Sequence, residues 1–361
     1  MKRAKYFLML AVLIAPSSLV AQGSPKQQVL PNITTIINVH SLGPQRIGNL
    51  PPVPVPPDNP QTSMKVQLGK QLYFDTRLSK DNTVSCQTCH DPAMGWSDAG
   101  PTSTGIHGQK GPRRAPPVSN AAYNPLQFWD GRAASLEEQA EGPMQNPVEM
   151  GNTLDNVVET LNGIPGYVEE FKQVFGTTPI TIAQVVQAIA AFERTVVTTD
   201  SPFDRYIRGD RKALTPLEKQ GMAIFNGKGH CTACHWGPDF SDGRFHNLGV
   251  VQTGPSKVDN GRYDVTHNPA DMGAFKTPTV RDAGLRPPYM HDGSEKTLET
   301  VVDLYNRGGG DNDPNLDPLI VPLGLSKEEV KALVAFMRVA LTSNNPEVAH
   351  VKPIPVSELP K

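Results

Sequence analysis

The four cysteines of this chain fall into two copies of one short motif, and this pattern constrains the fold more than any other feature. The copies are Cys86-Gln-Thr-Cys89-His90 and Cys231-Thr-Ala-Cys234-His235, and no cysteine is left over. The spacing Cys-x-x-Cys-His is the attachment signature of c-type haem. Two thiols bond to the vinyl groups of the porphyrin, and the adjacent histidine reaches the iron as its proximal ligand. The sequence therefore predicts two covalently bound haems.

Other uses of these cysteines are a redox disulfide at each motif, or one structural zinc ion held by all four thiolates. Neither use requires a histidine directly after the second cysteine, and both copies have one. The haem interpretation is therefore preferred.

Composition narrows the class of protein further. The length of 361 residues is typical of two domains of ordinary size. With 34 basic and 36 acidic residues, the chain has no surplus of positive charge for binding nucleic acid. Hydrophobic residues make up 38% of the chain, so a disordered protein is not expected.

The N-terminal segment is typical of a secretory signal peptide. Basic residues at positions 2, 3 and 5 precede an apolar run over residues 6–15, which small residues follow. This run is too short to cross about 30 Å of hydrocarbon as a helix, which disfavours a membrane anchor. We expect residues 1–21 to be a signal peptide and the mature protein to act in a bacterial periplasm.

The rest of the chain is expected to be mainly α-helical, with two haem modules joined near residues 200–213. Helical patterns recur along it, whereas β-strand patterns are sparse. Capping boxes at Thr215–Glu218 and Ser326–Glu329 mark the starts of two helices. Residues 22–62 form a proline-rich arm that could wrap the body or contact a partner, although a solvated spacer is the simpler interpretation.

Three segments carry a family resemblance: LGKQLYFDTRLSKDNTVSCQTCHDP, APPVSNAAYNPLQFWDGRAASLEEQAEGPMQNPVEM and FKTPTVRDAGLRPPYMHDGSEKTLETVVDLYNRGGG. In these motifs and in their order, residues 64–342 resemble the bacterial dihaem cytochrome c peroxidase superfamily, which includes the MauG proteins. The resemblance implies two cytochrome-c-like helical domains. Residues 63–205 would hold the peroxidatic haem and residues 206–345 the electron-transfer haem, with residues 346–361 as a C-terminal tail.

The resemblance also implies roles for three residues of the first domain. Glu149 in NPVEM is similar to the family's distal acid/base glutamate, which moves a proton from the near oxygen of peroxide to the far one. Gln139 corresponds to a second polar group in that pocket. Trp129 in QFWDGRA matches a tryptophan that lies between the two haems and can relay electrons. Without the resemblance, Glu149 would be interpreted as a helix start or an arginine partner, and Trp129 as a core residue.

Ligation on the open side of each iron divides the family into subclasses. His107, in a glycine-flanked loop, lies about where peroxidases of this family carry a detachable ligand of the first iron. The alternative is that His107 is a surface residue and that the first iron is open, as in MauG-like members. Tyr305 takes the place of the usual methionine ligand of the second iron, and Met290 and Met272 are rival ligands.

A calcium site between the domains is also implied by the resemblance. Its usual asparagine is replaced here by Arg114, and carbonyl groups would come from Arg286 and Pro288. The positive charge of Arg114 could replace the ion, which makes calcium doubtful.

The sequence thus predicts a periplasmic dihaem peroxidase that reduces hydrogen peroxide to water. Its electrons would come from a small protein such as a cytochrome c or a cupredoxin, and homodimers are common among the proteins it resembles. Two alternatives remain open. One is a MauG-like oxidase that uses high-valent iron to oxidise residues of a partner protein, and the other is a non-catalytic dihaem electron carrier.

Overall fold

The computed structural model describes residues 48–250, 252, 258–310, 313–343, 345, 348 and 351–361. The predicted signal peptide and the first part of the arm, up to residue 47, lie outside these described residues. Among the helices of the described chain, none has the length and apolar character needed to span a membrane.

The described chain is mainly helical, which confirms the predicted class. The helices of the first half, residues 48–200, are α1 (Ser63–Phe74), α2 (Cys86–Cys89), α3 (Leu136–Gln145), α4 (Leu154–Asn162), α5 (Pro165–Phe175) and α6 (Ile182–Glu193). Those of the second half, residues 201–343, are α7 (Pro202–Ile207), α8 (Pro216–Asn226), α9 (Tyr263–Thr266), α10 (Leu298–Asn306) and α11 (Lys327–Ala335). Two short strands, β1 (Phe245–His246) and β2 (Phe275–Lys276), pair antiparallel.

Side chains predicted to cap helices do so in the structure. At the start of α8 the Thr215 hydroxyl accepts a hydrogen bond from the Glu218 N–H, and the Glu218 carboxylate accepts one from the Thr215 N–H at 2.8 Å. The same reciprocal pair joins Ser326 and Glu329 at the start of α11. Both capping boxes confirm the predicted helix starts. Because α8 ends at Asn226, it delivers the chain directly to the second cysteine motif.

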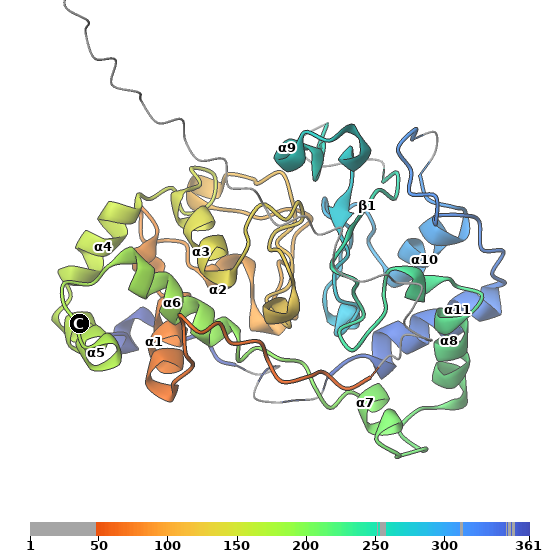
Figure 1. Cartoon of the computed structure of the whole chain (residues 1–361), viewed down its shortest axis with the longest axis horizontal. Coiled ribbons are helices and arrows are strands. Elements are labelled where there is room, and N and C mark those ends of the chain that lie inside the picture. The colour runs from red at the N-terminus through yellow and green to blue at the C-terminus, as the bar shows by residue number, and fades with distance from the viewer. Residues whose placement is uncertain are drawn as a thin grey trace, which may run out of the picture. The chain divides into compact units, whose positions relative to one another are not determined.

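Each half contains one pair of tightly packed helices. Helix α1 packs on α6, and α8 packs on α11 (Figure 1). A glycine permits the close approach at each contact. A Cβ atom on Gly69 would lie 1.8 Å from the carbonyl oxygen of Ala188, and one on Gly221 would lie 2.0 Å from that of Ala332.

Buried hydrophobic side chains gather into two large clusters around these helix pairs. One cluster draws on residues 68–189 and the other on residues 203–341. Two haem domains would each need a hydrophobic core, so two clusters agree with that expectation. The exact domain boundaries, residues 63–205 and 206–345, stay predictions.

The described part of the arm, residues 48–62, contacts the body at several points, so this stretch is not a free spacer, although most of its residues are exposed. The side chain of Asn59 is only 1% exposed. Its amide donates to the Glu137 carboxylate at 2.7 Å and to the Gln187 carbonyl at 2.9 Å. These partners lie on α3 and α6, which the sequence pattern of the arm could not reveal.

The same stretch also contacts the second half. The Gly48 carbonyl accepts a hydrogen bond from the Arg281 guanidinium at 3.3 Å, and the Pro51 carbonyl accepts one from the Tyr123 hydroxyl at 2.7 Å. Residues 48–62 therefore cross from one half to the other.

We expect Gly69→Ala and Gly221→Ala each to destabilise the protein by about 1–3 kcal/mol, because the added methyl group collides with a helix backbone. The change is measured as the shift in the urea unfolding midpoint of the haem-loaded protein. Gly163→Ala is the matched control, since its Cβ would lie 3.4 Å from the Thr160 carbonyl oxygen, an ordinary contact distance. Equal stability of all three variants would show that the helix contacts are looser than the structure has them.

Candidate functional site

A cavity of about 500 Å³ lies beside the first cysteine motif. Cys86, Cys89 and His90 line it together with Gln139 and Glu149. The two cysteines are the end residues of the single-turn helix α2, Gln139 lies on α3, and Glu149 lies in the turn that follows α3. The fold therefore brings the motif and both predicted polar residues to one cavity.

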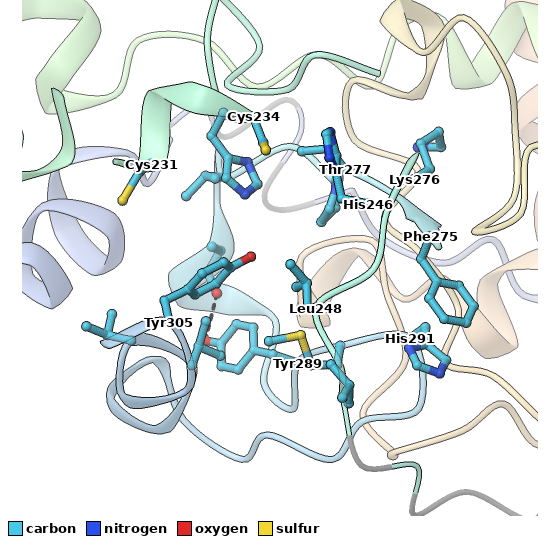
Figure 2. A pocket seen from close by; sticks show the side chains of 18 of the residues that line it. Cys231, Cys234, His246, Leu248, Phe275, Lys276, Thr277, Tyr289, His291 and Tyr305 are labelled. Atoms are coloured by element: carbon cyan, nitrogen blue, oxygen red, sulfur yellow. Dashed lines mark hydrogen bonds between the residues drawn. The ribbon is translucent and has the colours of Figure 1, made fainter. Parts of the chain in front are cut away.

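A second cavity, of about 240 Å³, lies beside the second motif (Figure 2). Cys231, Cys234 and His235 line it, and Tyr305 and Met290 face them from other segments. Tyr305 belongs to α10, which packs on α11. Each cysteine motif thus has a cavity of its own.

Both motifs fit a covalently bound haem. All four cysteines are unpaired and the two pairs line different cavities, so they neither form disulfides nor converge on one zinc ion. The Nδ1 atom of His235 lies 2.9 Å from the Phe240 carbonyl oxygen, which fixes the ring so that Nε2 is left for iron. Burial lowers the pKa of His90 to about 4, so its imidazole is neutral, as an iron ligand must be.

Glu149 has the environment of a proton-transfer group. Its carboxylate accepts a hydrogen bond from the Asn146 amide at 2.7 Å. Burial raises its pKa, while the positive charge of Arg132 and the hydrogen bond from Asn146 oppose that rise. A raised pKa brings a carboxyl group closer to the neutral range in which it can both take and return a proton.

Arg132 is a residue of this site that the sequence reasoning missed. It lines the first cavity, and its guanidinium lies 3.5 Å from the centre of the Phe128 ring. The signal was present in the sequence, because Arg132 belongs to the same QFWDGRA motif as Trp129.

His107 lies away from the cavity. Its side chain is 66% exposed, and its Nδ1 is 3.5 Å from the Asp81 carboxylate. The loop that carries it is fixed to the backbone beside Glu149, since the Ile106 N–H donates to the Glu149 carbonyl at 2.8 Å. The structure therefore does not bring His107 to the first motif, and its role as a detachable ligand stays a prediction.

Trp129 lies in the wall between the two cavities. Trp129 and residues 114–117 line both of them. The indole Nε1 donates to the Arg114 carbonyl at 2.8 Å, and the Trp129 carbonyl accepts from the Lys276 N–H at 2.7 Å. An electron relay between two haems would have to occupy this position; that Trp129 acts as one stays a prediction.

A stacked pair of rings lines the second cavity close to this wall. The rings of Phe275 and His291 are 3.7 Å apart and nearly parallel (Figure 2). The backbone N–H of Arg114 donates to the His291 carbonyl at 2.7 Å, which ties the pair to the wall.

Of the three candidate ligands of the second iron, two face the cavity. Burial raises the pKa of Tyr305, whose ring points into the cavity from α10 (Figure 2). Met290 also lines the cavity. Met272 is not among the described residues that line it, and its backbone carbonyl accepts a hydrogen bond from Asn247.

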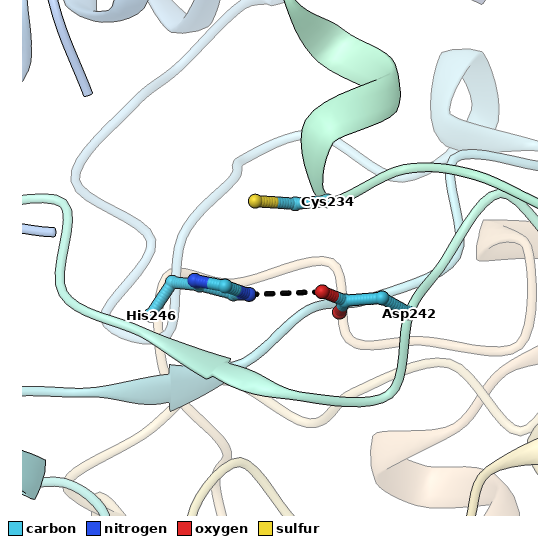
Figure 3. Close-up of side chains that lie close together, drawn as sticks. All are labelled: Cys234, Asp242 and His246. Atoms are coloured by element: carbon cyan, nitrogen blue, oxygen red, sulfur yellow. Dashed lines mark hydrogen bonds and ion pairs between the residues drawn. The ribbon is translucent and has the colours of Figure 1, made fainter. Parts of the chain in front are cut away.

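His246 is a second residue that the sequence reasoning missed. Its Nδ1 lies 2.5 Å from the Asp317 carboxylate. Its Nε2 lies 3.0 Å from the Asp242 carboxylate (Figure 3). Burial lowers the pKa of His246, but the hydrogen bonds to the flanking carboxylates oppose this and the pKa is raised. Although Cys234, Asp242 and His246 could together hold a metal ion, haem attachment at Cys234 would use the thiol that such an ion needs.

The residues at the expected calcium position do not fit that ion. The guanidinium of Arg114 already donates hydrogen bonds to the backbone carbonyls there. The carbonyls are those of Asp98, Gly100, Arg286 and Pro287, so Pro287 takes the place that the sequence reasoning gave to Pro288.

Comparison with known proteins adds an independent finding. Residues 63–212 match the family described as di-haem cytochrome c peroxidase. The chain is 42% identical to cytochrome-c peroxidase IdrP1 of Pseudomonas sp. (strain SCT), over 82% of this chain and 86% of that protein. It is 43% identical to methylamine utilization protein MauG of Methylorubrum extorquens, over 79% and 80%. The crystal structure of a MauG-like protein associated with microbial copper homeostasis matches with a TM-score of 0.77 and 32% identity, over 84% of this chain and 95% of that one.

Replacing both cysteines of one motif, Cys86→Ser with Cys89→Ser, should halve the covalent haem content, from two haems per chain to one. The content is measured from the pyridine haemochrome spectrum after non-covalent haem has been extracted. The pair Cys231→Ser with Cys234→Ser is the matched variant and should give the same value. A haem content unchanged by either pair would exclude attachment at that motif.

Proposed function

This chain belongs to the di-haem cytochrome c peroxidase family, and we propose that it is a periplasmic enzyme that reduces hydrogen peroxide to water. The electrons would come from a small redox protein such as a cytochrome c or a cupredoxin. Each cysteine motif would carry one c-type haem, within domains of residues 63–205 and 206–345. The observation that carries the proposal is the position of Glu149, in the same cavity as His90 and Cys89.

The residues of the first cavity account for the proton transfer that peroxide reduction requires. One peroxide takes two electrons and two protons and gives two waters. When bound, haem supplies the iron that holds peroxide and passes electrons to it. Glu149 would accept the proton from the oxygen nearer the iron and donate it to the farther oxygen, so that water leaves as the O–O bond breaks. Asn146 holds the carboxylate in place for this step, and Gln139 offers a second polar group.

The position of His107 supports a first iron that needs no loop movement before it meets peroxide. The side chain lies at the surface beside Asp81, and its loop is hydrogen-bonded to the backbone of Glu149. An open first site is the arrangement that the sequence analysis associated with MauG-like members.

Tyr305 favours a second candidate function, a MauG-like oxidase that removes electrons from a partner protein. We propose Tyr305 as the second ligand of the second iron, because it faces Cys231 and Cys234 across the cavity. A phenolate is a hard anionic donor that stabilises oxidised iron. The 43% identity to a MauG protein is compatible with this reading.

One experiment separates these functions. The haem-loaded protein is reduced by one electron, mixed with hydrogen peroxide, and followed by absorption spectroscopy with and without a reduced cytochrome c. Rapid oxidation of the cytochrome c supports the peroxidase. A long-lived oxidised species that the cytochrome c does not discharge supports the oxidase, and no reaction with peroxide leaves an electron carrier and contradicts both proposals.

We expect Glu149→Gln to lower kcat/KM for peroxide by about 10²–10⁴, because the amide cannot take the proton. The control is Glu141→Gln, which removes a carboxylate of α3 that does not line the cavity. Haem content and spectrum should be unchanged in both variants. A Glu149→Gln enzyme with the wild-type rate would remove Glu149 from the mechanism.

The pH dependence provides a second test of Glu149. Burial raises the pKa of Glu149, so on acidification its carboxylate becomes protonated at a higher pH than that of an ordinary glutamate. Because the reaction needs the basic carboxylate, the rate should fall over the same pH range. Arg132→Met removes a charge that lowers this pKa, so the acid limb of the kcat/KM profile should move to still higher pH. A limb that stays in place would show that another group titrates.

A further inference from the structure

The side chain of Arg114 is buried where four backbone carbonyl groups from two distant segments converge, and its guanidinium donates to all four. Only 4% of the residue is exposed. Its Nη1 donates to the Gly100 carbonyl, and its Nη2 donates to the Asp98 carbonyl. Nη2 also lies 3.3 Å from the Pro287 carbonyl oxygen and 3.5 Å from that of Arg286. We call these four carbonyl groups the carbonyl cage.

Some arginines of the described chain contact carboxylates directly, whereas the buried side chains of Arg262 and Arg286 donate to backbone carbonyls, as that of Arg114 does. Arg281 makes two hydrogen bonds of 2.9 Å to Asp204, and Arg113 contacts Asp130 and Asp259 at 2.6 Å. Arg114 has no ion pair within 4 Å among the described residues. Burial lowers its pKa to about 10, so it remains positively charged at neutral pH.

Four convergent carbonyl oxygens are the kind of ligand set that calcium prefers. The cage draws its carbonyl groups from two segments far apart in the sequence, residues 98–100 and 286–287. A divalent ion bound there would cross-link these two segments. The guanidinium already contacts all four oxygens, and its charge would repel a second cation. We propose that Arg114 is a built-in cation that takes the place of a divalent metal ion, so that the protein holds its two halves together without calcium.

The backbone of Arg114 shows what this cross-link positions. Its carbonyl accepts the hydrogen bond from Trp129, its N–H donates to the His291 carbonyl, and the residue lines both cavities. A side chain fixed in the carbonyl cage therefore fixes the wall between the cavities. The inference rests on this geometry and holds for a peroxidase and an oxidase alike.

The wild-type protein gives the first test. Haem-loaded protein is treated with EDTA, passed into metal-free buffer and titrated with calcium chloride in a calorimeter, while its unfolding temperature is recorded with calcium and with EDTA. We expect no calcium binding at millimolar concentrations and the same unfolding temperature in both buffers. Binding of one calcium ion per chain, or a lower unfolding temperature in EDTA, would overturn the proposal.

Two substitutions then separate the role of the charge from that of the space it fills. Arg114→Asn empties the carbonyl cage and offers one oxygen ligand, whereas Arg114→Met empties it and offers none. In EDTA both variants should unfold about 5 °C or more below wild type, because buried carbonyls lose their donors. Calcium should raise the unfolding temperature of Arg114→Asn and leave that of Arg114→Met unchanged.

Arg338→Asn is the control for the loss of an arginine, since Arg338 pairs with Glu299 at the surface. It should match wild type in both buffers. A variant of Arg114 that is as stable as wild type in EDTA, or an Arg114→Asn variant that calcium does not stabilise relative to Arg114→Met, would contradict the proposal. The wild-type titration decides the metal question even if a variant fails to fold.

Discussion

Three hydrogen bonds that involve the backbone of one wall hold the two cavities at a fixed spacing. Arg114 donates to the His291 carbonyl, Trp129 donates to the Arg114 carbonyl, and Lys276 donates to the Trp129 carbonyl. Because backbone groups supply most of these partners, the wall does not depend on flexible side chains for its position. A ring held in this way keeps a fixed position relative to each cavity, as the proposed electron relay would need.

Buried charge reinforces the contact between the halves. Arg113, next to Arg114, lies between Asp130 of the first half and Asp259 of the second. Such pairs add little net stability, because desolvation offsets the attraction, but loss of one member leaves an uncompensated buried charge. A shifted alignment of the two halves would break these ion pairs and leave such charges uncompensated. The pairs therefore favour the observed alignment over shifted ones. The carbonyl cage around Arg114 acts in the same direction with neutral partners.

Sequence reasoning predicted the features that short patterns encode. The cysteine motifs, the helical class and the capping boxes depend on residues within a few positions of one another, and the structure has the last two as expected. The expected placement of Glu149 and Trp129 beside the haem sites came from the family resemblance. A family motif is tied to a position in the three-dimensional fold, which local sequence patterns do not provide. Their catalytic roles are open to the experiments above.

What the sequence could not supply are contacts between distant segments. The pairing of His246 with Asp317 joins residues 71 positions apart, and no periodicity links them. The surface position of His107 depends on a loop fixed to the backbone of Glu149, which glycine content alone does not predict. The arm was misjudged for a related reason, since a proline-rich composition indicates an extended backbone but not the surface that the backbone lies on.

The contacts of the arm join parts of the chain that are synthesised at different times. Gly48 is made long before Arg281, yet the two share a hydrogen bond across 233 positions. Asn59 likewise waits for Gln187, which is 128 positions further along the chain. Since Gln187 and Arg281 follow the arm in the sequence, these two hydrogen bonds can form only after both later segments have been synthesised. The arm therefore depends on the completed chain for these contacts and cannot make them by itself.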